Sequence, residues 1–504
     1  MPSIVVKALL LATLAFTHLA HSRTLTSSSP NSTSTSACPL EPGEQSSQIV
    51  NHPPTWPYQV FKSSPFTPPK LQITTNGKPL APGLLFITPS EQSAVVATSD
   101  VAPLIMTDAG QLVFNGPIVN ATNFRHATYK GKDILTYWSG LSTAGANVGH
   151  GYGNVTFLDD TYTEILTVCP KFGLVTPDNT QYPCEADLHE SYTTGRDTIL
   201  VSAYNATPTD LTSVGGPKDG WVFDCLFFEI EPESAKILFR WSALEHVPVI
   251  DSKQPLAGTG LNQTVPWDWF HINSVVNVGN EYLVNSRHVW TTYLLTAKGD
   301  IIWRIQGDTG GDFGPLPADA HFRRQQRHPP HQRPRTPPPP PPSNTTPVVV
   351  LKDLSDPTDP IYADSQGSTE ILPNGNTLMD YGQIPVLKEY GPGADVRYTA
   401  RFAADDLVQS YRGFKHEWHA TPTTNPSLVV EKNGTRGAGY VSWNGATEVT
   451  AWAVYEGPSK RELGFVGRVG YKGFETMFGV AEKCVQVVAL VGGKTGAKSN
   501  VACT

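Results

Sequence analysis

The chain has 504 residues, a formal net charge of −8 and a sequence pI near 6.0. The acidic balance argues against a nucleic acid as a general partner, because phosphate binding needs a broad cationic surface. The length allows two to four ordinary domains, although β-rich sandwiches, barrels and propellers also form single units of this size.

The N-terminal segment predicts a secretory signal peptide over residues 1–22. It reads MPSIVVKALLLATLAFTHLAHS, with one early lysine, an apolar stretch up to Phe16, and small residues near Ala20 where a signal peptidase can cut. A membrane anchor is the alternative, but the apolar stretch is shorter than the roughly 20 residues that span a bilayer. We therefore expect a secreted, extracellular protein with no stable membrane anchor after cleavage.

Glycosylation sequons and cysteines support this location. Seven N-x-S/T sequons without proline at the middle position occur, at Asn31, Asn120, Asn154, Asn205, Asn262, Asn344 and Asn433. Six cysteines, an even number, suggest three disulfides in an oxidising compartment. The near neighbours are Cys169 with Cys184 and Cys484 with Cys503, which would leave Cys38 with Cys225, although connectivity cannot be read from sequence. No two cysteines have the C-x₂₋₄-C spacing of a metal site, so no metal is expected.

Residues 23–70 are rich in Ser, Thr and Pro and predict an extended leader that lies along the folded body. From residue 71 the pattern predicts an all-β protein, with short runs of Val, Ile, Thr, Tyr and Trp separated by Gly, Asn, Asp and Pro. The runs form a loose repeat: DILTYWSG at 133, TILVSAYN at 198, EYLVNSRH at 281, NTLMDYGQ at 376 and GYVSWNGA at 439. Turns precede several of these runs, which indicates antiparallel strands joined by hairpins.

The spacing of this repeat favours a β-propeller over residues 71–504. Its members start about 65, 83, 95 and 63 residues apart, which is too irregular for WD40 repeats but suits blades with long insertions. Radial repetition lets many short strands avoid open edges, and an array of two-sheet sandwiches is the alternative. The widest gap contains a Pro/Arg-rich tract at 323–346. Because proline cannot donate to a sheet ladder, this tract cannot form a blade.

Residues 267–307 hold the densest set of candidate catalytic side chains. In a regular strand His271 and Asn273 point to the same face, and Arg287 lies one hairpin later, where it can reach the same place. An imidazole, an amide and a guanidinium together suit an anionic group. Arginine binds two of its oxygens, asparagine donates to a third, and histidine transfers a proton or acts as a nucleophile.

A second candidate is His189, which is flanked by Asp187 and Glu190, since a carboxylate can orient an imidazole. Four further histidines are expected to be hydrogen-bonded packing residues: His150, His246, His416 and His419. The glycines of GHGYGN around the first of these predict a tight turn rather than a phosphate cradle. The sequence has no P-loop and no EF-hand spacing, so we expect no cofactor, although a propeller axis can hold a metal that no motif announces. The oligomeric state stays open.

Several motifs resemble, in order and spacing, the secreted fungal branch of the arylsulfotransferase family: FRWSALEHVPV, PWDWFHINSVVNVGNEYLVNSRH, GDIIWRIQG, QGSTEILPNGNTLMDYG, SYRGFKHEW and YVSWNGATEVTAWAVYEG. The resemblance implies a six-bladed β-propeller with a central active site. It also implies transfer of a sulfuryl group from a phenolic sulfate donor to a phenol acceptor, through a sulfohistidine and without a nucleotide sulfate. On the family's motifs, His271 and Asn273 match an H-x-N pair, Arg287 a funnel arginine and His189 an earlier active-site histidine.

The Pro/Arg-rich tract interrupts this resemblance where the family's sulfated histidine is expected. Three explanations stay open. His328 or His331 serves as the nucleophile after a local insertion, although neighbouring prolines oppose a regular strand. The protein is instead a non-catalytic extracellular propeller that binds anionic ligands. Or the tract comes from a wrong reading frame or a retained intron. The candidate catalytic residues are therefore His271, Asn273, Arg287, His189 and His328.

Overall fold

The computed structural model describes residues 56–91, 102–143, 149–316, 354, 356–405, 407–433 and 436–504. Within these ranges the chain is all-β, as the sequence predicts, and its helical content is three short 3-10 turns: η2 (Thr212–Val214), η3 (Val249–Asp251) and η4 (Gly311–Phe313). None of the helices in the described ranges is long and apolar enough to cross a membrane. The predicted signal peptide, the tract at 323–346 and His328 lie outside the described residues.

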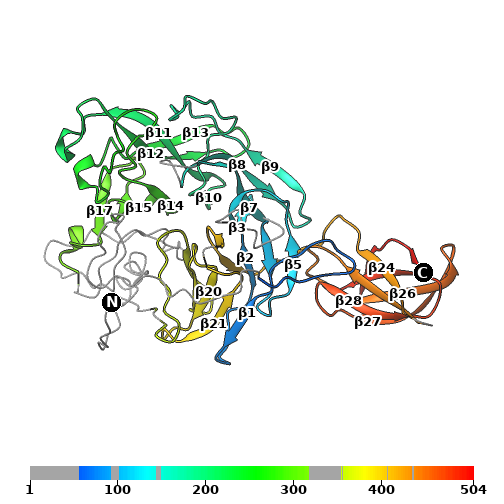
Figure 1. Cartoon of the computed structure of the whole chain (residues 1–504). Coiled ribbons are helices and arrows are strands. Elements are labelled where there is room, and N and C mark those ends of the chain that lie inside the picture. Colours follow the sequence, from blue (N-terminus) through cyan, green and yellow to red (C-terminus); the bar gives the residue numbers. More distant parts are fainter. Residues whose placement is uncertain are drawn as a thin grey trace, which may run out of the picture.

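Five antiparallel sheets of four or more strands make up the main body of the described chain (Figure 1). Sheet 1 contains β2 (Leu84–Ile87), β4 (Leu104–Met106), β5 (Leu112–Asn115) and β23 (Phe414–His416). Sheet 2 contains β6 (Ala121–Tyr129), β7 (Lys132–Ser142), β8 (Gly151–Leu158) and β9 (Glu164–Val168). Sheet 3 contains β10 (Ser191–Thr193), β11 (Ile199–Thr209), β12 (Gly220–Ile230) and β13 (Ile237–Ser242).

Sheets 4 and 5 repeat this plan. Sheet 4 contains β14 (Ile272–Val278), β15 (Glu281–Ser286), β16 (Thr291–Leu295) and β17 (Ile301–Gln306). Sheet 5 contains β18 (Ser368–Ile371), β19 (Thr377–Asp380), β20 (Val386–Tyr390) and β21 (Val396–Arg401), with β1 (Gln72–Thr75) added beside β21. A separate two-stranded pair joins β3 (Pro89–Glu91) to β22 (Val408–Ser410).

The sheets are arranged like the blades of a propeller. Strands of sheets 2 to 5 pair in chain order, as in four-stranded blades. The first strands of neighbouring sheets contact one another, since β6 contacts both β10 and β23, and β23 also contacts β18. Sheet 1 is closed by strands from distant parts of the chain, because β23 pairs with β2 through Leu84 and His416. The number of blades in the complete ring remains a prediction.

The repeat found in the sequence marks the second strand of each blade. Its first four members begin within one residue of the start of β7, β11, β15 and β19. Hydrophobic clusters lie between neighbouring sheets and hold the blades face to face. Sheets 3 and 4, for example, share a core that contains Phe227, Trp241, Trp269, Phe270 and Tyr293, all at most 1% exposed. Each aromatic side chain of this kind contributes roughly 1.5–3 kcal/mol on burial.

The fifth member of the repeat belongs to a different structure. GYVSWNGA begins in β25 and continues into the turn that follows, and β25 is part of a C-terminal lobe of two packed sheets that is separate from the five sheets of the main body (Figure 1). One sheet contains β24 (Ser427–Asn433), β25 (Arg436–Ser442) and β28 (Glu475–Val480). The other contains β26 (Val449–Ser459), β27 (Glu462–Gly470), β29 (Cys484–Val491), β30 (Lys494–Lys498) and β31 (Ala502–Cys503). The prediction that one propeller extends to residue 504 is therefore corrected, because an alternating strand pattern is the same in a blade and in a sandwich.

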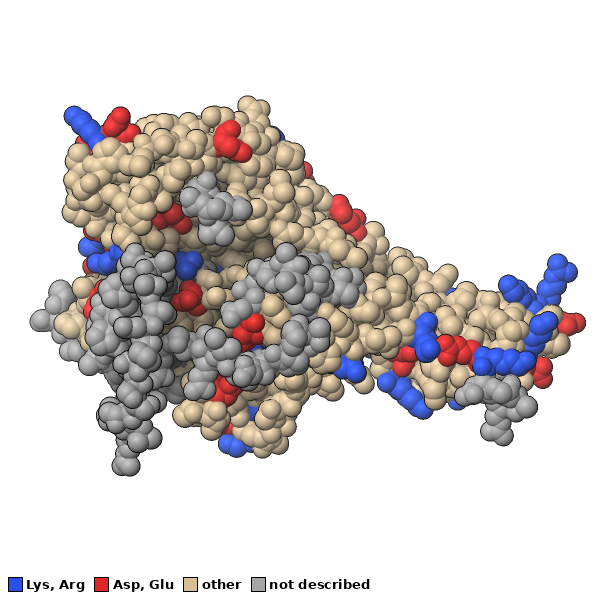
Figure 2. Space-filling view, viewed as in Figure 1, with Lys and Arg blue, Asp and Glu red and all other residues tan. Residues whose placement is uncertain are grey.

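The C-terminal lobe projects from the main body and carries many of the Lys and Arg side chains visible on one face (Figure 2). It has its own apolar core, which includes Leu428, Trp452 and Val485. Residues 56–70 of the predicted leader join the two parts. Gln59 donates to the carbonyl of Gly110 in the main body, at 3.0 Å.

The leader also contacts the C-terminal lobe directly. The Ser63 hydroxyl donates to Glu475 at 2.6 Å, and the ring of Phe61 packs on that of Phe474, with centres 4.6 Å apart. The described part of the leader therefore lies along the folded body, and it reaches both of its parts.

Two of the expected disulfides are confirmed: Cys169–Cys184 and Cys484–Cys503. The expectation that Cys225 is the partner of Cys38 is wrong, since Cys225 is a free thiol in the described structure, fully buried in the core between sheets 3 and 4. Its place in the interior of β12, surrounded by aromatic side chains, removes it from the surface where a partner cysteine could reach it.

Candidate active site

Three histidines gather on the main body, each at or just before the start of a strand. His150 directly precedes β8, His189 lies two residues before β10, and His271 directly precedes β14. Their ring centres are 4.6 Å apart for His189 and His271, 5.3 Å for His150 and His271, and 5.9 Å for His150 and His189. All three side chains are at least 96% buried. The sequence separates these residues by up to 121 positions, and the packing of sheets 2, 3 and 4 brings them together.

His271 is held in an unusual backbone conformation. Its φ angle is +54°, in the left-handed region that side-chain-bearing residues rarely adopt and that is enriched at functional sites. The Asp268 carboxylate lies 2.5 Å from Nδ1, whereas the buried Nε2 has no hydrogen-bond partner among the described residues. With the proton on Nδ1 towards the carboxylate, Nε2 presents a lone pair.

His189 has the same kind of carboxylate partner. Its Nδ1 lies 2.6 Å from Asp187 Oδ1, and the same oxygen accepts from the His189 backbone N–H at 2.9 Å. Asp187 is itself fixed by the backbone N–H of Gly151 and by the hydroxyl of Ser202. The disulfide Cys169–Cys184 closes the loop that leads into this segment. His189 is therefore oriented by a carboxylate that is itself held in place.

Asp268 is the anionic centre of the cluster. Its Oδ2 lies 3.3 Å from His150 Nε2 and 3.7 Å from the Nδ1 of a fourth imidazole, His288. Burial alone would raise the pKa of Asp268, but His271, His150 and His288 hold it well below its usual range. The carboxylate is therefore ionised at neutral pH.

The imidazoles differ in their tendency to hold a proton. Burial lowers the pKa of His271 well below its usual range and also lowers that of His189, although Asp268 and Asp187 oppose this. Burial acts in the same direction on His150, but the Asp268 carboxylate outweighs it and raises the pKa of His150. The site thus combines an imidazole whose pKa is raised with imidazoles whose pKa is lowered, which is the separation of pKa values expected between a general acid and a nucleophile or base.

A layer of buried charge lies next to the histidines. The fully buried guanidinium of Arg412 donates to Asn123 Oδ1 at 2.8 Å, to Glu190 Oε1 at 3.0 Å and to the carbonyl of Asn273 at 2.6 Å. Arg125 lies 3.4 Å from the same Glu190 oxygen. These contacts tie sheets 1 to 4 together at the ends of their first strands, directly beside His189 and His271.

The structure places the predicted residues at different points of this region. His189 and His271 share the cluster. The backbone N–H of Arg287 donates to the carbonyl of His271 at 3.0 Å, and its partly exposed guanidinium donates to the carbonyl of Asp364 at 3.1 Å. Its charge acts on His150 and His288.

Asn273 does not follow the strand alternation assumed from sequence. The pairing of β14 with β15 shifts register between Ile272 and Ser274, and the Asn273 side-chain oxygen accepts from Asn285 Nδ2 at 2.9 Å. Because the pairing is irregular at this point, strand alternation does not place the amide of Asn273 on the same face as the imidazole of His271.

Two residues of the cluster were missed by sequence reasoning. His150 was expected to be a packing residue, and Asp268 was not singled out. The signal for Asp268 was its position three residues before His271, whereas nothing local to GHGYGN pointed to a partner in sheet 4. His246 behaves as expected, since its Nδ1 lies 2.8 Å from the carbonyl of Ser242 and its ring stacks on Trp241. His419, in contrast, is an exposed side chain beside Glu448, not a packing residue.

The cluster also has the composition of a metal site. Candidate ligand atoms of His150, Asp268 and His271 all lie within 4.8 Å of one another, and so do those of His150, Asp187 and His189. Cysteine spacing excludes only a thiolate metal site, because folding brings these histidines and carboxylates together from distant parts of the chain.

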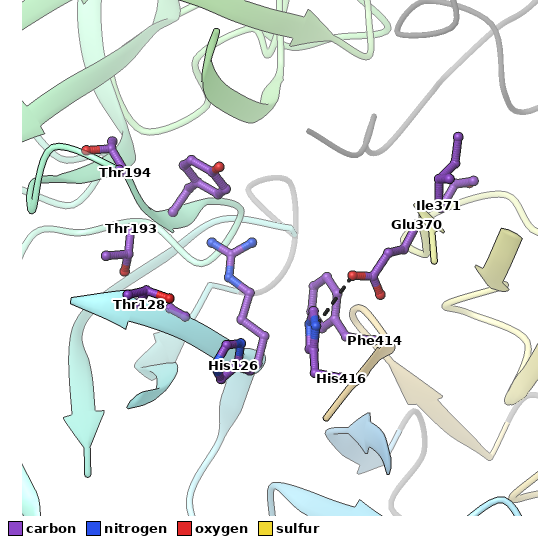
Figure 3. Close-up of a pocket in the computed structure, with 13 residues that line it drawn as sticks. His126, Thr128, Thr193, Thr194, Glu370, Ile371, Phe414 and His416 are labelled. Carbon is purple, nitrogen blue, oxygen red and sulfur yellow. Dashed lines mark ion pairs between the residues drawn. The ribbon is translucent and has the colours of Figure 1, made fainter. Parts of the chain in front are cut away.

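A separate cavity of about 350 Å³ lies at the other ends of the first strands (Figure 3). It is lined by residues from β6, β10, β18 and β23, among them Arg125, Tyr192, Glu370 and His416. His416 and Glu370 face each other across 3.6 Å. Because Arg125 contacts both this cavity and Glu190, the buried charge layer lies between the cavity and the histidine cluster.

Comparison with known families matches residues 125–330 and 342–403 to the model described as arylsulfotransferase (ASST). This is just over half of the chain, and it includes the entire histidine cluster. The fold and the site thus define a propeller-like protein with a central imidazole and carboxylate centre. The chain belongs to the arylsulfotransferase family, which indicates aryl sulfotransferase activity.

Solved structures show only a distant likeness, and no curated protein sequence matches. A protein of unknown function from Bacteroides caccae is 10% identical, with a TM-score of 0.26 over 72% of this chain and 84% of its own. A GH43 protein, BlXynB, from Bacillus licheniformis is 9% identical, with a TM-score of 0.25 over 85% of this chain and 91% of its own.

Proposed function

We propose that this protein transfers a sulfuryl group from an aryl sulfate ester to a phenol, through a sulfohistidine and without a nucleotide sulfate donor. Family membership supports the reaction class. The observation that carries the proposal is His271, a buried imidazole whose Nδ1 is bound to Asp268 and whose Nε2 has no hydrogen-bond partner among the described residues.

In the first step the Nε2 lone pair of His271 attacks the sulfur of the donor. An N–S bond forms while the bond between sulfur and the aryl oxygen breaks, and the departing phenolate takes a proton from His150. Asp268 holds the Nδ1 proton of His271 and stabilises the positive charge that develops on the ring. The guanidinium of Arg287 is assigned to the sulfuryl oxygens, where charge accumulates in the transition state.

In the second step an acceptor phenol attacks the sulfur, and the N–S bond breaks. The phenol proton passes to His150, so both histidines return to their starting states. His189, whose ring lies edge-on to that of His271, fixes the position of the reacting imidazole. His328, outside the described residues, is the competing candidate for the covalent histidine.

The test is transfer of the sulfuryl group from 4-nitrophenyl sulfate to phenol, with the absorbance of the released nitrophenolate as the measured signal. We expect His271→Gln to lower the rate about 100-fold or more, and Asp268→Asn to lower it with a changed pH profile. His246→Gln is the matched control, because His246 is a half-buried histidine of the main body that packs on Trp241. This variant should retain activity. Mass mapping of the trapped protein under alkaline conditions locates the sulfohistidine. Sulfate on His328 would move the nucleophile there, and absence of turnover in a folded protein would contradict the proposal.

We further infer secretion with N-glycosylation, and a ring of six blades. The signal-like N-terminus, the sequons and the two disulfides support secretion. N-terminal sequencing of the protein exported by a eukaryotic host, with and without glycosidase, tests the first inference. Retention of residues 1–22 in the exported protein would contradict it.

A further inference from the structure

We propose that the cavity between β6, β10, β18 and β23 is a second ligand site, which binds a small aromatic anion: a single ring that carries a carboxylate or a sulfur oxyanion. The site is separate from the histidine cluster, and no step of the proposed transfer reaction uses it. Binding at this site goes beyond the proposed function and does not depend on it.

The cavity has the size and the opening of a small-molecule site. Its volume is about 350 Å³, near the lower end of the range for ligand pockets, roughly 300–1,000 Å³, which suits one aromatic ring with a charged substituent. Two lining residues, Thr128 and Gly195, are exposed, so a ligand can enter on that side. Figure 3 shows Thr193 and Glu370 on opposite sides of the space.

Two buried polar groups of the lining have no hydrogen-bond partner among the described residues. They are Nη1 of Arg125, whose side chain is 5% exposed, and the hydroxyl of Thr193, a residue that is 9% exposed. Their strands, β6 and β10, contact each other. A guanidinium only donates and a hydroxyl can donate, and buried donors are costly when they lack an acceptor. An oxyanion in the cavity would supply an acceptor to both.

The charges beside the cavity favour an anion at Arg125. The guanidinium groups of Arg125 and Arg412 lie 3.4 Å and 3.0 Å from the same oxygen of Glu190, so two positive charges share one negative charge. The carboxylate of the lining is Glu370, which faces His416 at 3.6 Å. An anionic group near Arg125 balances the second guanidinium in a charge-assisted contact, and Glu370 directs it away from the other side of the cavity.

The walls of the cavity favour an aromatic ligand. The guanidinium carbon of Arg125 lies 5.0 Å from the ring centre of Tyr192 and 5.7 Å from that of Phe414. The rings of His126 and His416, which also line the cavity, have centres 5.6 Å apart. Aromatic rings pack well against one another, so these walls suit the flat body of an aryl ligand better than an aliphatic one.

Binding is tested by calorimetric titration of the full chain with benzoate and with benzenesulfonate. We expect a Kd of about 0.01–1 mM for both, which is the range for ligands of about ten non-hydrogen atoms. Cyclohexanecarboxylate, which has the charge but no aromatic ring, should bind at least about 3-fold more weakly than benzoate. The tighter of the two aromatic anions identifies whether the natural ligand carries a carboxylate or a sulfur oxyanion.

Variants of the lining locate the bound anion. Thr193→Val removes the unpartnered hydroxyl and keeps the shape of the side chain, so the protein should fold and bind benzoate about 5- to 10-fold more weakly. Thr88→Val is the matched control, because Thr88 is also buried with no partner for its hydroxyl among the described residues, but it does not line the cavity. Its affinity for benzoate should be unchanged. Arg125→Gln should lose measurable binding.

The outcomes distinguish this site from the histidine cluster. Absence of binding of either aromatic anion up to about 10 mM, or unchanged affinity in a folded Thr193→Val protein, would overturn the proposal. Binding that is lost in His271→Gln but kept in Thr193→Val would also overturn it, since the anion would then lie at the histidine cluster. If Arg125→Gln does not fold, as judged by its thermal unfolding, Thr193→Val decides. Absence of sulfuryl transfer contradicts the proposed function and leaves these titrations unaffected.

Discussion

The main body and the C-terminal lobe differ in how much charge their interiors contain. The main body contains buried charge: Arg412 and Glu190 beside the histidine cluster, and Lys388 and Glu389 in β20 of sheet 5, each with essentially no exposed surface. In the C-terminal lobe, among the side chains described over residues 427–432 and 437–504, the single buried charged one is Glu456, which accepts hydrogen bonds from two backbone N–H groups.

The difference indicates where this chain carries function. The C-terminal lobe shows that the same polypeptide can build an apolar core with almost no buried charge. Buried ion pairs are weak evidence for stability, because desolvation offsets much of their attraction. The buried charge of Arg412 and Glu190 therefore requires another explanation, and its place directly beside His189 and His271 links it to the imidazole cluster.

The largest effect should follow removal of the charge at the centre of the ring. Arg412→Met leaves Glu190 buried without its main cation, so we expect the free energy of unfolding of the ring to fall by about 3–5 kcal/mol. Denaturant unfolding monitored by tryptophan fluorescence measures it. Arg240→Met, at a half-exposed arginine paired with Glu245, is the control and should change stability by at most about 1 kcal/mol. Equal losses of the free energy of unfolding in Arg412→Met and Arg240→Met would show that the buried charge matters no more than a surface ion pair.

Removal of a covalent link should affect the lobe alone. We expect the double variant Cys484→Ser/Cys503→Ser to lose about 2–4 kcal/mol in the C-terminal lobe, because a disulfide restricts the unfolded chain. Calorimetry should show a lowered transition for the lobe, while the transition of the main body is unchanged. An equal shift of both transitions would show that the two interiors are coupled.

A smaller loss of stability, which depends on pH, is expected from a change at Glu229, where sheets 3 and 4 meet. Burial alone would raise the pKa of Glu229, but hydrogen bonds from Thr198, Tyr282 and Arg196 outweigh it, so the pKa is lowered. A lowered pKa in the folded state gives stability that is fully present above the unfolded value of about 4.3 and lost as pH falls through the folded value.

Glu229→Gln should therefore cost about 1–2 kcal/mol near pH 7 and progressively less below pH 4, on the scale of hydrogen bonds to a charged group. Thermal unfolding of both proteins across this pH range measures the difference. A cost that grows as the pH falls would contradict the assigned sign.

The smallest effect concerns the contact between the leader and the lobe. The Ser63 hydroxyl donates to Glu475 and also lies 2.8 Å from the hydroxyl of Ser442. We expect Ser63→Ala to lower the stability of the lobe by about 1 kcal/mol. The midpoint of unfolding of the lobe reports it, and a larger shift in the ring than in the lobe would show that the leader mainly supports the ring.

The sequence predicted the positions of the strands better than it predicted which strands pair in one sheet. Alternating apolar residues located β7, β11, β15 and β19, because side-chain alternation is a local property of a strand. The same property made β25 look like part of a blade, since only its partner, β28, distinguishes a sandwich strand from a blade strand.

The site could be predicted in part for the same reason. Motif resemblance located His189 and His271, whereas the partners that orient and charge them come from tertiary packing. His150 reaches Asp268 across two sheets, and the shifted register after Ile272 breaks the alternation used for Asn273. Contacts between distant segments leave no local periodicity from which they could be read.

The buried thiol of Cys225 is an internal reporter of local opening of the core between sheets 3 and 4. Burial raises the pKa of this thiol well above its usual value, so the reactive thiolate is absent while the core between sheets 3 and 4 is closed. An alkylating reagent can therefore modify Cys225 only during transient opening, and peptide mapping of the adduct distinguishes it from any other thiol. The rate of that modification measures how often the blades that carry His189 and His271 separate, with no mutation and no attached dye.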